Sequence, residues 1–113
     1  MFAGSTAVVG VAAGQKLVAS AEAPVGLSAG AIPQTFQYGL CYQDASVAGT
    51  SIINFVGGNY SIGLVTPDRQ AFPASALVIP GAGSWRVGFC ILNGSAATIN
   101  NNDFVNGWVM VIS

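Results

Sequence analysis

Apolar and polar residues alternate along much of the chain with a period of two. The clearest example runs from Gln15 to Pro24, where leucine and alanines face one way and Lys16, Val18, Ser20 and Glu22 face the other. Because successive side chains of a β-strand point to opposite faces, this pattern predicts a half-buried strand that ends at Pro24. Turn-forming residues recur about every ten positions, and no segment shows helical periodicity.

These turn signals divide the chain into eight or nine strands. We expect strands at 5–11, 15–24, 36–43, 51–56, 60–65, 74–79, 84–92 and 104–112, with a short ninth near Thr98-Ile99. The glycine-rich segment 25–35 is expected to form a long loop or an irregular edge. The pattern predicts an all-β fold in a single domain, residues 1–113: a β-sandwich of the jelly-roll type with antiparallel strands.

Two features of this pattern bear on the arrangement of the strands. Gly57-Gly58-Asn59 is expected to reverse the chain tightly, since glycine and asparagine tolerate positive φ. Segments 74–79 and 106–112 are apolar on both faces. We therefore expect the first to be central in its sheet and the second to lie away from an exposed edge.

Two matching stretches hold the only cysteines of the chain: Tyr38-Gly39-Leu40-Cys41-Tyr42 and Val87-Gly88-Phe89-Cys90-Ile91. In both, one face is bulky and apolar while the other is small, polar or thiol. We expect two antiparallel neighbours that share an aromatic core face, with Cys41 opposite Cys90, Gly39 opposite Leu92 and Gln43 opposite Gly88. A disulfide between Cys41 and Cys90 would then lie on the face away from the core. Two free thiols are the alternative if the protein is made in a reducing compartment.

The composition is poor in charge. Only three basic and four acidic residues occur among 113, while 52% of residues are hydrophobic. A small domain has too much surface to hide this much apolar material alone, which predicts burial against other copies in a homo-oligomer. No stretch of about 20 residues is apolar enough to span a lipid bilayer as a helix. Three basic residues give no electrostatic footprint for nucleic acid.

The chain offers little catalytic chemistry. It has no histidine, which removes Ser-His-Asp and Cys-His triads and the commonest zinc ligand. Asp44, Asp68 and Asp103 lie in predicted loops, with no spacing that indicates a glycosidase pair. Segment 100–103 could offer oxygens to calcium, but only one of its side chains is charged, so we expect turn formation instead. We therefore expect no enzyme activity, no metal site and no cofactor.

The two cysteine stretches and the closing Asn102-Asp103-Phe104-Val105-Asn106-Gly107-Trp108-Val109 resemble small β-sandwich modules of bacterial secreted and surface proteins. The strand count and glycine-rich turns also resemble the C1q/TNF jelly roll, whose members trimerise. The resemblance covers residues 36–112 and carries over no functional residue. It implies an extracellular or cell-surface location, and by analogy a trimer.

The leading hypothesis is a non-catalytic extracellular structural module that self-assembles, as a subunit of a surface trimer, an appendage or a shell. The alternative is a carbohydrate-binding module that uses exposed Tyr, Trp and Asn side chains. Most aromatic residues fall on predicted core faces. Tyr60, beside Asn59 in the glycine turn, is the expected exposed exception, so these two residues are the candidate glycan contacts.

Overall fold

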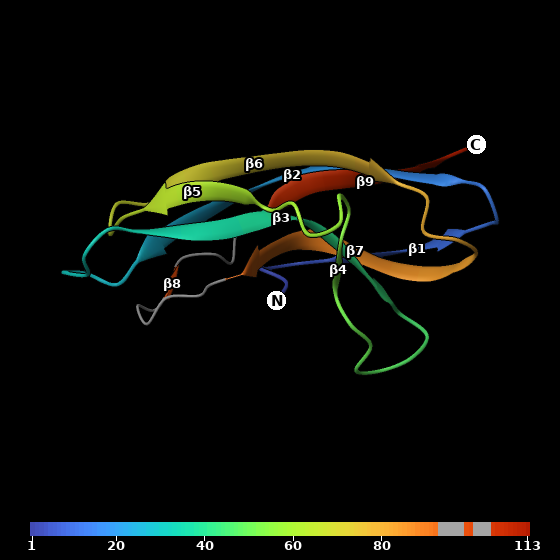
Figure 1. The fold of residues 1–113 in the computed structure, drawn as a ribbon, viewed down its shortest axis with the longest axis horizontal. Helices are drawn as coiled ribbons and strands as arrows, with labels where there is room; N and C mark the ends of the chain where they lie inside the picture. Colours follow the sequence, from blue (N-terminus) through green and yellow to red (C-terminus); the bar gives the residue numbers. More distant parts are fainter. Residues whose placement is uncertain (93–98, 101–104) are drawn as a thin grey trace.

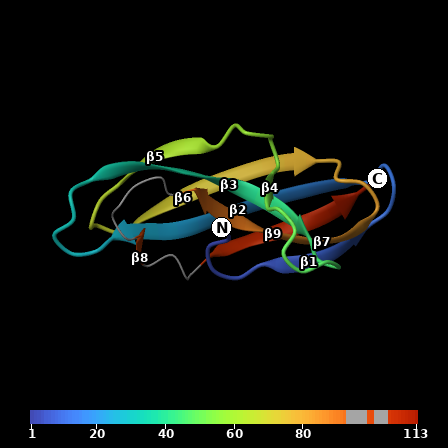
Figure 2. The same ribbon diagram turned by 60° about the horizontal axis from the view of Figure 1, so that its bottom comes forward.

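The computed structural model describes residues 1–92, 99–100 and 105–113. The regular elements of this part are all strands, arranged in two facing antiparallel sheets (Figures 1 and 2). They are β1 (Ala7–Val11), β2 (Lys16–Leu27), β3 (Gln34–Asp44), β4 (Ile53–Asn54), β5 (Ser61–Val65), β6 (Gln70–Val78), β7 (Gly83–Leu92), β8 (Ile99–Asn100) and β9 (Asn106–Ile112). The predicted all-β sandwich is confirmed.

The first sheet, sheet A, has the order β1-β7-β3, with β4 and β5 both paired to the far edge of β3. The second, sheet B, has β2 between β6 and the successive strands β9 and β8. Figure 1 shows β6, β2 and β9 along the top, above β7 and β1. Thr98 of the predicted short strand, residues 101–103 of the calcium candidate (including Asp103) and Phe104 of the predicted last strand lie outside the described residues.

The core lies between the sheets in two clusters. One gathers around Phe36, Phe72 and Phe89, and the other around Leu17, Leu40 and Val87. Edge-to-face contacts lock the aromatic rings: Phe36 and Phe72 have centroids 4.8 Å apart, and Tyr42 and Trp85 5.3 Å. The bulky face predicted for the two cysteine strands is therefore the core face.

Strand β2 is longer than predicted. It passes through Pro24 and continues to Leu27, so the expected loop at 25–35 shrinks to the residues between β2 and β3. Strand β9 pairs with β2 as far as Glu22, and β8 pairs with β2 from Gly26. Pro24 lies between these two paired stretches. A residue that cannot donate a backbone hydrogen bond is tolerated at this interruption of the ladder.

Segment 57–59 does not reverse the chain, and this prediction is wrong. Strands β4 and β5 both run antiparallel to β3, so they follow each other along its edge in one direction. The residues between them loop out and return to the same edge. Gly57 has a φ of 71° there, so the glycine is needed for a left-handed turn within a bulging loop, not for a hairpin.

The two segments that are apolar on both faces lie at sheet edges, contrary to expectation. Within the described residues, β6 and β9 each pair with β2 alone. Pro73 lies inside β6 opposite Glu22, and proline in a sheet is confined mainly to edge strands. The second apolar face of each strand therefore points away from the core, with consequences described below.

The disulfide forms, but in a different register. Strands β3 and β7 are antiparallel neighbours, as predicted, and Cys41 and Cys90 are bonded. However, Cys41 lies opposite Gly88, and Cys90 lies opposite Gly39. The bond is thus diagonal, with Cα atoms 5.8 Å apart, inside the usual range for disulfides. Each cysteine faces a glycine directly, so neither sulfur competes with a facing side chain.

Candidate functional site

The outer face of sheet A carries the disulfide, which the chain itself covers. Cys41 and Cys90 are 0% and 1% exposed. On one side Phe2 and Thr6 pack over Gly88, where an added Cβ would lie 2.8 Å from Thr6 Cγ2 and 3.0 Å from Phe2 Cδ1. The two glycines of the cysteine strands therefore make room for a cover.

The N-terminal arm is fixed in this position by backbone hydrogen bonds along β7. Ala3 N donates to Phe89 O at 2.9 Å, and Ile91 N donates to Met1 O at 2.9 Å. Phe2 forms an isolated bridge with Cys90. The arm thus extends the ladder of β1 past the end of that strand, and this places the Phe2 ring over the cysteine layer.

The loop between β4 and β5 covers the other side. The Tyr60 hydroxyl lies 3.7 Å from Cys41 Sγ, and the Tyr60 ring lies next to Gly39. Tyr60 is therefore half-buried, not the exposed side chain that the sequence suggested. Asn59 is exposed, and its amide Nδ2 donates to Val56 O at 3.3 Å within the same loop. The two candidate glycan contacts are neighbours in the chain, but only Asn59 is open to solvent.

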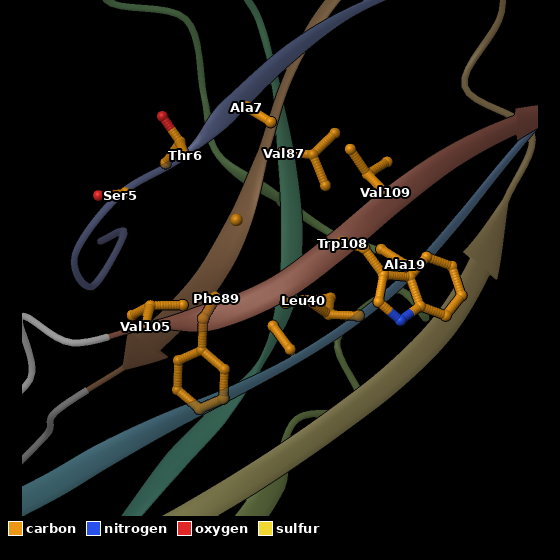
Figure 3. A pocket seen from close by; sticks show the side chains of 13 residues that line it. Ser5, Thr6, Ala7, Ala19, Leu40, Val87, Phe89, Val105, Trp108 and Val109 are labelled. Carbon is orange, nitrogen blue, oxygen red and sulfur yellow. The ribbon is translucent and has the colours of Figure 1, made fainter.

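A cavity of about 180 Å³ opens between the sheets, beside β1 and β9 (Figure 3). Ser5, Thr6 and Ala7 line it from one side, and Val105 and Val109 from the other. Alanine and glycine residues from several strands leave this space unfilled. The two hydroxyls at its rim belong to Ser5 and Thr6, and Thr6 Oγ1 accepts a hydrogen bond from Arg86 Nη1 at 3.2 Å. The cavity is mostly apolar and brings no acid–base pair together.

The outer face of sheet B is different at its centre, because large apolar side chains stand there uncovered. We call this set the apolar face: Val18, Leu77, Trp108, Met110 and Ile112. Register places Leu77, Val18 and Met110 in one row across the three strands, with Trp108 in the next row beside Ser20. Trp108 is 54% exposed, and Leu77 and Met110 are each 48% exposed.

The sequence pattern located only part of this face. The alternation of residues 15–24 correctly placed Val18, Ser20 and Glu22 on the side away from the core. It did not identify Trp108, because β9 has large apolar residues at successive positions and either face qualified as the core face. Val109 and Val111 pack inward against the second core cluster, which turns Trp108 and Met110 outward.

A shallow hollow of about 230 Å³ adjoins Trp108 on this face. Ser20, Glu22, Pro73 and Asn106 also line it. An exposed indole therefore stands beside a carboxylate, an amide and a hydroxyl, on strands rather than on a loop. This combination offers an apolar platform with hydrogen-bonding groups at its border.

Within residues 1–92, 99–100 and 105–113 there is no group of three or more Cys, Asp or Glu side chains that could hold a metal ion. The same residues contain no helix long and apolar enough to cross a bilayer. Comparisons with protein-family models, with curated proteins and with solved structures found no match to this chain.

Proposed function

We propose that this chain is a non-catalytic structural module that works by self-association outside the cytoplasm. The apolar face of sheet B is the observation that carries the proposal. Its side chains stand on a regular sheet, where neighbouring residues form a continuous surface. Fully burying a large apolar side chain contributes about 1.5–3 kcal/mol, and since these side chains are about half exposed, each has roughly half of that to gain on association. Contiguous exposed apolar patches of this kind mark interaction sites.

Two further observations support this proposal. The disulfide is buried and joins two neighbouring strands, and such bonds persist in oxidising compartments, which favours an extracellular or cell-surface location. The chain also has no histidine for general acid–base chemistry. A subunit of a surface oligomer, an appendage or a shell fits these properties.

The mass of the protein in solution tests the proposal. We expect the wild type to sediment as an oligomer at micromolar concentration. Replacing two residues of the apolar face, Trp108→Ser with Met110→Ser, should give a folded monomer. The matched control is Ile62→Ser with Leu64→Ser, two side chains on β5 of sheet A that are 70% and 56% exposed. This control should remain oligomeric, whereas a monomeric wild type would contradict the proposal.

Carbohydrate binding is the second candidate function, and the hollow beside Trp108 favours it. An indole can stack on a sugar ring while Glu22, Asn106 and Ser20 accept or donate hydrogen bonds. Titration of a panel of soluble oligosaccharides, followed by tryptophan fluorescence, tests this idea. Binding that is lost with Trp108→Ser would support the hollow as the glycan site. Binding that is lost with Asn59→Ala would instead support a glycan site at Asn59 and Tyr60 in the loop between β4 and β5. No saturable response in the wild type would refute both.

A further inference from the structure

We propose that two copies of this chain pack through the apolar faces of their sheets B, about a two-fold axis that lies between the two sheets and passes over β2 at the level of Ala19. This inference rests on the proposed self-association and adds its partner surface and its symmetry.

Charged residues are scarce on the three long strands of sheet B. Strands β2, β6 and β9 together contain just two charged residues, Lys16 and Glu22. Both lie on the outer face of β2, because Leu17, Ala19 and Ala23 between and beyond them are buried in the core. They are six positions apart, which corresponds to about 20 Å along a strand. The apolar face lies between a positive end and a negative end.

A face with one positive and one negative end can pack on its own copy in two symmetric ways. When a sheet face packs on its own copy, the two-fold axis lies in the plane between them. An axis along the strands would bring Lys16 onto Lys16 of the partner subunit, and Glu22 onto Glu22 of the partner subunit. An axis across the strands brings Lys16 to Glu22 of the partner subunit, and the reverse contact forms at the other end. Like charges that face each other are costly, so the second arrangement is favoured.

The same symmetry also brings large apolar side chains of the two copies together. Trp108 pairs with Ser20 and Met110 pairs with Val18, so both pairs lie one position away from Ala19 along β2. The axis exchanges the two positions. Trp108 therefore faces Met110 of the partner subunit, and the contact forms twice. Sulfur and aromatic rings attract each other, and aligned sheets pack with strands inclined by about 30°.

Charge exchange tests this arrangement. Lys16→Glu and Glu22→Lys are single variants at solvent-facing strand positions, and each should weaken self-association about tenfold, because each creates two like-charge contacts. The double variant K16E/E22K restores both contacts with reversed sign, so its dissociation constant should return to within about threefold of the wild type. An equimolar mixture of the two single variants should also associate like the wild type. Circular dichroism and thermal melting confirm that all variants are folded.

The outcomes separate this inference from the proposed function. Sedimentation that gives a wild-type dimer, weakened singles and a restored double variant supports the two-fold arrangement. A wild-type oligomer that ignores the single substitutions, or a double variant as weak as the singles, overturns it and leaves self-association standing. A mass of three copies also overturns it. A monomeric wild type refutes self-association itself, and with it this interface.

Discussion

The outer faces of the two sheets differ in whether other segments of the chain cover their centres. At the centre of sheet A the outward residues are the disulfide and two glycines, and the chain covers them with Phe2 and Tyr60. At the centre of sheet B the outward residues include Val18, Trp108 and Met110, and within the described residues no segment of the chain covers them. The centre of one face is covered by the molecule itself, while the centre of the other is exposed.

The size of the outward side chains explains this difference. A glycine opposite each cysteine leaves a shallow depression, which a ring from a neighbouring segment can fill at short distance. Apolar rows such as Leu77, Val18 and Met110 fill their own side of the sheet and offer a broad surface instead. A broad apolar surface is covered more effectively by another sheet than by a loop.

The largest expected effect concerns the disulfide, which lies beneath Phe2 and Tyr60 on the outer face of sheet A. Replacing both cysteines, Cys41→Ala with Cys90→Ala, should lower the free energy of unfolding by about 4 kcal/mol. The bond joins residues 49 apart in sequence, and on the chain-entropy account a loop of that length restricts the unfolded chain by this amount. Urea unfolding of the variant measures the loss.

Reduced wild type is the control for this prediction and should show a similar loss. Self-association through sheet B should persist under native conditions, because the disulfide lies on the outer face of the other sheet. A change of less than about 1 kcal/mol would contradict the account.

The next largest effect concerns the close contact that holds β9 against β2. A Cβ added to Gly107 would clash with the backbone oxygen of Ser20, so Gly107→Ala should destabilise the protein by about 1–3 kcal/mol. Thermal melting monitors it. The control is Gly10→Ala in β1, where no heavy atom lies within 4 Å of the added Cβ. Equal effects of the two variants would show that β9 does not approach β2 this closely.

A smaller effect tests whether Phe2 covers the cysteine layer of sheet A. Gly88→Ala places a methyl group against Thr6 Cγ2 and the Phe2 ring, and a loss of about 1 kcal/mol is expected because the ring can shift. Hydrogen exchange should accelerate at the Ala3 amide, which donates to Phe89 O. Gly58→Ala in the exposed loop, where the added Cβ meets nothing within 4 Å, is the matched control. Unchanged exchange at Ala3 would argue against the cover.

The smallest effect lies in the turn that leads from β3 toward the Tyr60 loop. The Ser46 hydroxyl and amide donate to Asp44 Oδ1 at 2.6 and 2.8 Å, and these bonds lower the pKa of Asp44. A lowered pKa in the folded state contributes stability above the unfolded pKa, and this is lost as pH falls through the folded value. Ser46→Ala should therefore lower the melting temperature slightly at pH 7 and have a smaller effect near pH 2. A difference that does not change with pH would refute this.

Several properties of this protein are determined by the sequence alone. Period-two alternation in residues 15–24 and the matching cysteine stretches predicted the all-β fold, the aromatic core and the pairing of β3 with β7. The cysteine pair itself was also predictable, because two strands with the same face pattern place their thiols on one side. These properties depend on the alternation of side chains along a single strand, which can be recognised without knowing the neighbours of that strand.

Tertiary structure alone decided the rest. The register of β3 on β7 differs by two positions from the expected one, and since a shift of two keeps every side chain on its face, alternation cannot detect it. Strands β6 and β9 are apolar on both sides, so only packing against β2 showed which side faces the core. The exposure of Trp108 follows from the second choice, and the burial of Tyr60 follows from the return of the β4–β5 loop to the edge of β3. A pattern along one strand records which residues share a face, whereas the neighbours of that face are set by the whole fold.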